Sequence, residues 1–197
     1  EPLVMNAGAN TRRPGWDLTF SAPKSVSVLW SQADPHTRHE IQDAHLAAVL
    51  SALSYLQDEQ SYGRRGKAGQ ARLRAGLAVA TFEHGTSRAL DPQLHTHCLV
   101  MNVAVLPDGT TSALFSKPIF KSKMTGGALY RAELAHQLQL KLGLFFEPKN
   151  DWFEVRGVPE GLCKIFSKRR AAIEEALGEL GVETASAAAF AALGTRT

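Results

Sequence analysis

The sequence predicts an α+β fold in which a central antiparallel β-sheet of about five strands is flanked by helices. Two observations support this class. Segments with alternating apolar and polar side chains, or with short β-rich runs, follow one another through Gly-marked turns, as in antiparallel strands. Segments with helical apolar spacing lie around these strands and do not alternate with them one by one, which argues against parallel βαβ units.

The N-terminal part predicts one strand and two helices. Residues 16–22, WDLTFSA, alternate and are rich in β-forming residues, so we expect a strand. Residues 22–33 then predict a short helix. Asp34 followed by Pro35 is typical of an N-cap with proline at the first helical position. The helix that it starts, over residues 36–60, has one apolar face, formed by positions 41, 44, 48, 49, 52, 53 and 56. His45 lies on or near this face, which favours a structural role.

The middle of the chain predicts the rest of the sheet. Residues 61–84 combine Gly-marked turns with an apolar run, which indicates a hairpin. Residues 94–105 predict a long strand, and Asp108-Gly109 marks a turn into residues 110–116. If residues 76–84 pair with this strand, about eight residues form the connecting loop.

The C-terminal part predicts helices and a small hairpin. Residues 123–142 have a helical pattern that stops at Gly143, a common C-terminal cap. Residues 144–157 predict two short strands, and residues 161–181 and 185–194 predict helices. Because no repeat or internal boundary is evident, we expect a single domain over residues 1–197.

Composition limits the possible classes. The chain has 197 residues, 44% of them hydrophobic and 21% charged, typical of a globular protein with an ordinary core. Two cysteines give no disulfide framework, so a reducing compartment such as the cytoplasm is expected. No apolar run approaches the roughly 18 residues of a membrane span, so we expect no membrane segment. The first residue, Glu1, is not methionine, and we expect the chain to be N-terminally incomplete.

Basic residues are unevenly distributed. The net charge of +3 is too small to establish a polyanionic partner. However, residues 63–82 contain no acid, and they carry Arg64, Arg65, Lys67, Arg72 and Arg74. A second acid-free block covers residues 109–132. Such blocks can bind phosphates, but a solvated surface kept soluble by its charge has the same composition. Both interpretations stay open on composition alone.

Three of the seven histidines lie around one predicted strand. Side chains alternate along a strand, so His95 and His97 project from the same face, about 7 Å apart, and Cys98 projects from the other. Antiparallel pairing brings His84 across from them. Three neutral imidazoles could bind a divalent metal and leave it open coordination positions. Asp17, on the third strand, could orient one imidazole. The alternative is a chance cluster of core or surface histidines.

Several separated motifs resemble one known family. PGWDLTFSAPKSVSVLW, ATFEHGTSRALDPQLHTHCLVMNVA, the DG turn and ALYRAELAHQLQLKLG are similar, in order, to conjugative relaxases of the TrwC/TraI (MobF) type. These relaxases belong to the HUH endonuclease superfamily, and the resemblance extends from about residue 12 to about residue 170. It implies a palm-like sheet. It also implies that His84, His95 and His97 bind a divalent metal and that Asp17 helps to activate the nucleophile.

The resemblance further implies the reaction. A tyrosine near the N-terminus of such a relaxase attacks one phosphodiester at the plasmid's origin of transfer, and the metal polarises that phosphate. Mg²⁺ or Mn²⁺ is the expected ion, with Zn²⁺ or Ni²⁺ as alternatives. The expected partners are single-stranded or hairpin DNA at the origin, relaxosome proteins and a C-terminal helicase domain. The basic residues at positions 64–74, with Lys24 and Arg88, are candidate DNA contacts, although Lys24 could be an exposed turn lysine. For Arg88, a structural pairing with Asp91 is favoured.

The sequence departs from the family at the nucleophile. Its three tyrosines are Tyr55, Tyr62 and Tyr130, and none precedes residue 16. We expect core roles for Tyr55 and Tyr130, whereas Tyr62 could stack on a base. The nucleophile is therefore expected upstream of Glu1, and this chain alone is expected to be inactive. Two other functions stay open: a metal- and DNA-binding module without a nucleophile, and a three-histidine zinc hydrolase.

Overall fold

The centre of the molecule is a four-stranded antiparallel sheet. Strand β5 (Pro92–Val105) pairs with β1 (Gly15–Ser21) on one side and with β4 (Gly76–Thr86) on the other, and the short β6 (Thr111–Ser112) pairs with the end of β5. The computed structural model describes residues 3–5, 7–168, 170–172 and 174–175. The sequence predicted about five strands, and the described sheet has four. The other strands form two separate two-stranded sheets.

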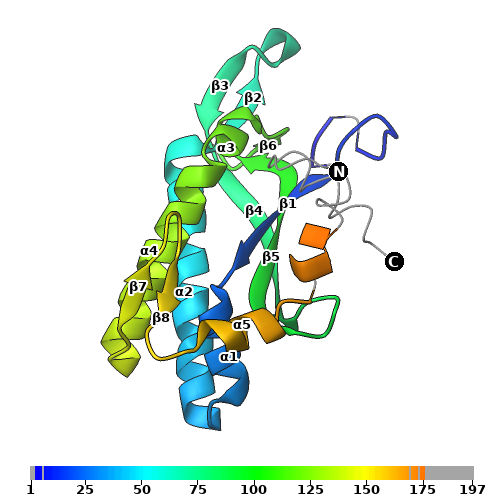
Figure 1. Cartoon of the computed structure of the whole chain (residues 1–197). Helices are drawn as coiled ribbons and strands as arrows, with labels where there is room; N and C mark the ends of the chain where they lie inside the picture. Colours follow the sequence, from blue (N-terminus) through cyan, green and yellow to red (C-terminus); the bar gives the residue numbers. More distant parts are fainter. Residues whose placement is uncertain (1–2, 6, 169, 173, 176–197) are drawn as a thin grey trace.

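Three helices cover one face of this sheet. They are α1 (Lys24–Gln32), α2 (Pro35–Gln60) and α4 (Lys123–Leu142). Helices α2 and α4 lie side by side behind the sheet (Figure 1). Every second residue of β5 points into this layer: Leu94, Thr96, Cys98 and Val100 are at most 3% exposed. The opposite face of β5, which carries the odd-numbered residues, is the one on which His95 and His97 lie.

Helix α2 follows its sequence pattern closely. The Asp34 carboxylate accepts hydrogen bonds from the backbone N–H groups of His36 and Thr37, at 2.9 and 3.1 Å, which confirms the predicted N-cap. The predicted apolar face is the buried one, since Ile41, Ala44, Ala48, Val49, Ala52 and Leu56 are at most 2% exposed. At the end of α4, Gly143 adopts φ 64°, as its predicted C-capping role requires.

A β-hairpin projects beyond the sheet (Figure 1). It consists of β2 (Tyr62–Arg65), the short turn η1 (Lys67–Gly69) and β3 (Ala71–Arg74). Its base is attached to the segment after β6, because Arg64 N–H donates to the Ala113 carbonyl and Phe115 N–H to the Tyr62 carbonyl. At Gly63 a Cβ atom would lie 2.6 Å from Ser112 Oγ, so glycine permits this close approach. The predicted hairpin is thus confirmed, with a base that is fixed to the body.

The remaining elements are short. They are α3 (Lys117–Lys121), β7 (Phe146–Pro148), β8 (Phe153–Val155) and α5 (Glu160–Ile165). The predicted pair of strands in residues 144–157 is confirmed by β7 and β8. The helix predicted over residues 161–181 is interrupted, since α5 ends at Ile165 and Phe166 follows as its C-cap. The helix predicted over residues 185–194 lies outside the described residues. None of the helices described is long and apolar enough to cross a membrane.

A buried polar network joins the sheet to both long helices. The imidazole of His45, on α2, is fully buried, with Nδ1 2.8 Å from Tyr130 Oη and Nε2 2.8 Å from Thr96 Oγ1. Burial, with a smaller contribution from positive charge on His95, lowers the pKa of His45 to about 4. Burial likewise raises the pKa of Tyr130. The neutral imidazole therefore donates one of these bonds and accepts the other, which confirms the predicted structural role of His45.

The network predicts a pH-dependent stability. The folded pKa of His45 is about 4, below its ordinary 6.5, so the unfolded chain binds the proton more strongly and stability falls as the pH drops between these values. From pH 7 to pH 5, the loss should be about 2 kcal/mol. Urea unfolding of the wild type and of His45→Gln at both pH values measures it. Equal pH dependence in the two proteins would contradict this account.

Candidate metal centre

Three histidine side chains gather on the face of the sheet that the helices leave open. His84 on β4 lies directly across from His95 on β5, and His97 follows two residues later on the same face. The ring centroids are 5.3 Å apart for His84 and His95, 5.4 Å for His84 and His97, and 5.1 Å for His95 and His97. The predicted convergence from two neighbouring strands is therefore present.

The connection between β4 and β5 is tighter than the sequence suggested. Pairing continues to Thr86 and Pro92, past a bulge after His84, so five residues remain between the strands instead of about eight. At Gly85 a Cβ atom would lie 2.4 Å from the Trp30 ring of α1. A side chain there would displace Trp30 or the strand, so glycine lets β4 pass close to α1 immediately after His84.

Two of the three imidazoles are oriented by hydrogen bonds at Nδ1. The Nδ1–H of His95 donates to the carbonyl oxygen of Gln93 at 2.8 Å. The Nδ1–H of His97 donates to Asp17 Oδ2 at 2.7 Å, and Thr19 Oγ1 lies 3.1 Å from the same nitrogen. A neutral imidazole that donates through Nδ1 keeps the lone pair of Nε2 free. Metal-binding histidines commonly donate such a hydrogen bond from the ring nitrogen that does not bind the metal. Asp17 accepts this bond from His97, as predicted.

The spacing of the rings fits a common ion. With metal–nitrogen bonds of about 2.1 Å, imidazoles at roughly tetrahedral angles place their ring centres about 5.3 Å apart. Among the described residues, however, no three His, Cys, Asp or Glu side chains form a ready metal-binding group. The spacing of the rings says more about metal binding than their present orientation does. Strand register fixes the spacing, whereas each imidazole can turn about its side-chain bonds. The spacing of the three rings therefore fits a divalent cation once the imidazoles turn toward a common point.

Cys98 takes no part in this cluster. It is fully buried on the helix-covered face, and burial raises the pKa of its thiol to about 11, with a further contribution from Asp17. Metal binding needs the thiolate, so a buried, protonated thiol on the opposite face is excluded as a ligand. The alternation of side chains predicted for this strand is confirmed.

The three tyrosines of the chain lie away from the histidine face. Tyr130 is buried behind the sheet and hydrogen-bonded to His45, and Tyr55 packs in the helix-covered core. Tyr62 lies at the base of the hairpin, under Arg74. The nucleophile expected upstream of Glu1 therefore stays a prediction, and Glu1 itself lies outside the described residues.

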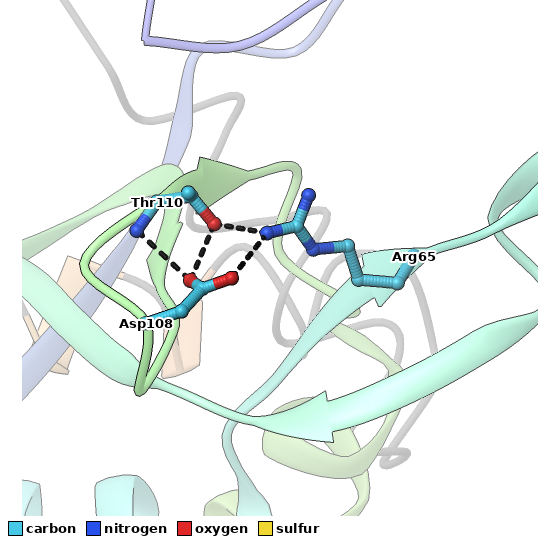
Figure 2. Close-up of polar contacts among 3 residues, drawn as sticks. All are labelled: Arg65, Asp108 and Thr110. Atoms are coloured by element: carbon cyan, nitrogen blue, oxygen red, sulfur yellow. Dashed lines mark hydrogen bonds and ion pairs between the residues drawn. The ribbon is translucent and has the colours of Figure 1, made fainter.

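The basic side chains of the hairpin differ in how they are held. Arg65 donates to Asp108 Oδ2 at 2.9 Å and to Thr110 Oγ1, so it ties β2 to the turn after β5 (Figure 2). The Thr110 hydroxyl, the Thr110 N–H and the nearby Arg65 charge together lower the pKa of Asp108. Arg74 pairs with Glu59 at 3.7 Å and lies over the ring of Tyr62. These two arginines have structural partners that the sequence did not reveal.

The other basic residues of the hairpin keep their charges exposed. The guanidinium groups of Arg64 and Arg72 lie 5.5 and 3.7 Å from the centre of the Phe115 ring, which positions them while leaving their N–H groups available. Lys67 is exposed at the tip and has no ion-pair partner among the described residues. These three are the better candidates for phosphate contacts.

Two predicted DNA contacts are placed differently from expectation. Lys24 is the first residue of α1 and not an exposed turn residue, and its Nζ donates to the Pro92 carbonyl at 2.9 Å. Partial burial lowers the pKa of Lys24. The favoured pairing of Arg88 with Asp91 was wrong. Within the described residues the buried Asp91 carboxylate accepts from the Lys168 backbone N–H at 2.8 Å, while Arg88 is exposed.

A second cluster of basic side chains was not predicted from the sequence. Arg12, Arg13 and Arg64 line a cavity of about 350 Å³ at the base of the hairpin, together with Trp16 and Asn102. Within the part of the chain that the structure describes, no acidic residue lines it. The run TRRPGW could have indicated this site, but Arg64 reaches it only through the fold.

The fold and site together define a class. A His-x-His strand, a third histidine on its antiparallel neighbour and a carboxylate that orients one ring, all on an open sheet face, are the features of an HUH-type endonuclease. A family model described as TrwC relaxase matches residues 1–197. The chain belongs to the TrwC relaxase family.

Comparisons with individual proteins agree. The chain is 37% identical to the multifunctional conjugation protein TraI of Escherichia coli and 36% identical to that of strain K12, over 89% of its own length. It spans about a tenth of these relatives. All of it superimposes on TrwC complexed with a 27-mer DNA comprising the recognition hairpin and the cleavage site, with a TM-score of 0.87, 33% identity and 72% of that chain covered. A copper-bound complex of TrwC with oriT DNA matches with a TM-score of 0.85, 33% identity and 69% coverage.

The hydrogen bonds at Nδ1 predict the tautomers of two histidines. At a pH where the imidazoles are neutral, His95 and His97 should both carry their proton on Nδ1, the less common tautomer in free histidine. Asp17→Asn should return His97 toward the Nε2–H form and leave His95 unchanged. Long-range ¹H–¹⁵N correlation spectra of the metal-free protein distinguish the forms. An Nε2–H tautomer at both positions in the wild type would refute the arrangement.

Proposed function

We propose that residues 1–197 belong to a relaxase domain and form all of it except the segment that carries the nucleophile. The complete domain would nick and rejoin one DNA strand at a plasmid origin of transfer, in the bacterial cytoplasm, with a divalent metal ion. The observation that carries the proposal is the pair of Nδ1 hydrogen bonds under His95 and His97. These bonds occupy Nδ1 and leave the Nε2 lone pairs of both imidazoles free to bind an ion. Membership of the TrwC relaxase family supplies the type of reaction.

The chain's own residues would hold the ion. His84, His95 and His97 are the proposed ligands, and Asp17 keeps His97 in the tautomer that binds. When bound, the ion polarises the scissile phosphate and stabilises charge on its oxygens. We propose Mg²⁺ or Mn²⁺ first, because the substrate offers phosphate oxygens. Imidazole ligands also suit Zn²⁺ and Ni²⁺, which remain the alternatives.

The hairpin would bind the DNA backbone. Arg64, Lys67 and Arg72 present charge at the exposed end of the molecule, and single-stranded or hairpin DNA at the origin is the proposed ligand. In solved structures that resemble this chain, TrwC is complexed with DNA that includes a recognition hairpin. A helicase domain and relaxosome proteins are proposed partners of the full-length protein.

The attacking hydroxyl needs a separate source. A nucleophile must approach the phosphate that the ion holds, and Tyr55, Tyr62 and Tyr130 all lie off the histidine face. We therefore propose that a tyrosine upstream of Glu1 supplies the nucleophile. On this basis the 197 residues alone would bind DNA and leave it uncut.

Two alternatives make different predictions. A binding module without a nucleophile would never form a covalent protein–DNA adduct, even as the full-length protein. A three-histidine zinc hydrolase would cleave simple phosphate or carboxylate esters without DNA. A denaturing gel of the full-length protein with origin DNA, and an assay with simple esters, separate the three functions.

Removal of one histidine should abolish tight metal binding. His97→Ala and His95→Ala remove a ligand each, whereas Cys98→Ala removes a buried thiol on the opposite face. Isothermal titration with Mn²⁺ should show at least a tenfold loss of affinity for the histidine variants and little change for Cys98→Ala. A Cys98 variant that loses Mn²⁺ as strongly as His97→Ala would overturn the assignment.

Hairpin charges should differ in their contribution to DNA binding. Removing one phosphate contact lowers the slope of log affinity against log salt by about 1. Substituting Arg64 and Lys67 by alanine should therefore flatten the slope by about 2. Arg65→Ala serves as the matched control, because Asp108 already neutralises that charge. Binding measured by fluorescence anisotropy at several salt concentrations tests this. An unchanged slope in the double variant would make the hairpin a solvated surface.

A further inference from the structure

Apolar side chains lie exposed on the open face directly beside the histidines. Phe82, Leu99 and Met101 are 50%, 38% and 40% exposed. The small side chain of Ala80 lies across from Leu99. These four residues form the apolar strip, which no element among the described residues covers. Exposed apolar groups that adjoin one another on a folded protein often mark a binding site.

Strand register puts the strip next to the metal ligands. Phe82 is the direct partner of His97 across the β4–β5 ladder, and it precedes His84 by two residues on the same face. Direct antiparallel partners lie about 5 Å apart. A group bound on Phe82 would therefore lie directly beside His84 and His97, two of the proposed metal ligands.

We propose that the apolar strip is a nucleobase subsite, in which Phe82 stacks on a base adjacent to the phosphate held at the histidines. The proposal rests on the proposed function, which brings a DNA phosphate to this face. The base of a nucleotide lies close to its own phosphate. Phe82 lies similarly close to His97, so it can contact the base of a nucleotide whose phosphate is held at the histidines. Aromatic side chains bind bases of single-stranded DNA in this way, with little dependence on sequence.

The surroundings favour a base over a segment of protein. A peptide packed on Phe82 would also cover His97 and His84, and it would block the ion's access to phosphate. Ala80 leaves room for a flat ring beside Phe82. The nearest acidic group on this face, Asp17, is committed to His97 at 2.7 Å, which limits its repulsion of a phosphate. The occupant that must reach this place for the proposed reaction is the DNA itself.

The test compares a normal with a base-free oligonucleotide. Oligothymidylate of about twelve nucleotides and an abasic chain of equal length carry the same phosphates, and only the first has bases. Affinities are measured by fluorescence anisotropy with Mn²⁺ for the wild type, Phe82→Ala and Phe82→Tyr. Phe145→Ala, which alters a phenylalanine that is 64% exposed just beyond the end of α4, is the matched control.

Phe82→Ala should weaken binding of oligothymidylate about tenfold and leave binding of the abasic chain unchanged. Phe82→Tyr should restore the affinity, Phe145→Ala should not reduce it, and Mn²⁺ affinity should be the same in all four proteins. An equal reduction for both oligonucleotides, or none, would overturn the stacking site. Wild-type protein that binds neither oligonucleotide would instead refute the proposed function.

Discussion

Antiparallel pairing of β4 with β5 sets the positions of the side chains at the site. Because side chains alternate along β5, the pairing sends Leu94, Thr96 and Cys98 into the helix layer and His95 and His97 outward. The same register sets His84 opposite His95 and Phe82 opposite His97. A slip of one residue would bury the imidazoles and expose the core, so the hydrophobic energy of the helix-covered face fixes the geometry of the open one.

The buried side of the sheet also specifies the ligand strand. Thr96 lies between the two histidines in sequence, and its hydroxyl bonds to His45, which in turn bonds to Tyr130. This network connects β5 to α2 and α4. Two polar layers therefore lie on opposite sides of one strand. The buried layer is neutral and holds the strand in place, and in the open layer Gln93 and Asp17 fix the imidazoles of His95 and His97 through Nδ1.

Local sequence patterns predicted the parts of the fold that depend on periodicity. The apolar face of α2, its Asp34 cap and the alternation of β5 each follow from neighbours in the chain. The short β4–β5 connection was not predictable from the local pattern, because it depends on pairing that continues past the bulge after His84 to Thr86 and Pro92. The same holds for Arg65 with Asp108, Lys24 with Pro92 and Asp91 with Lys168. These contacts join residues that only the folded chain brings together, and they give Arg65 and Lys24, two of the predicted DNA contacts, partners within the protein.

The central claim is that three imidazoles hold an ion that contacts a DNA phosphate. Pulsed electron paramagnetic resonance of the Mn²⁺-loaded protein with a single-stranded oligonucleotide tests it most directly, because it detects magnetic nuclei bonded close to the ion. The account predicts ¹⁴N couplings from histidine, reduced in His97→Ala, together with a ³¹P coupling that appears when DNA is added. Mn²⁺ that shows ³¹P coupling without ¹⁴N coupling would be bound to the DNA and not to the histidines, and would contradict the account.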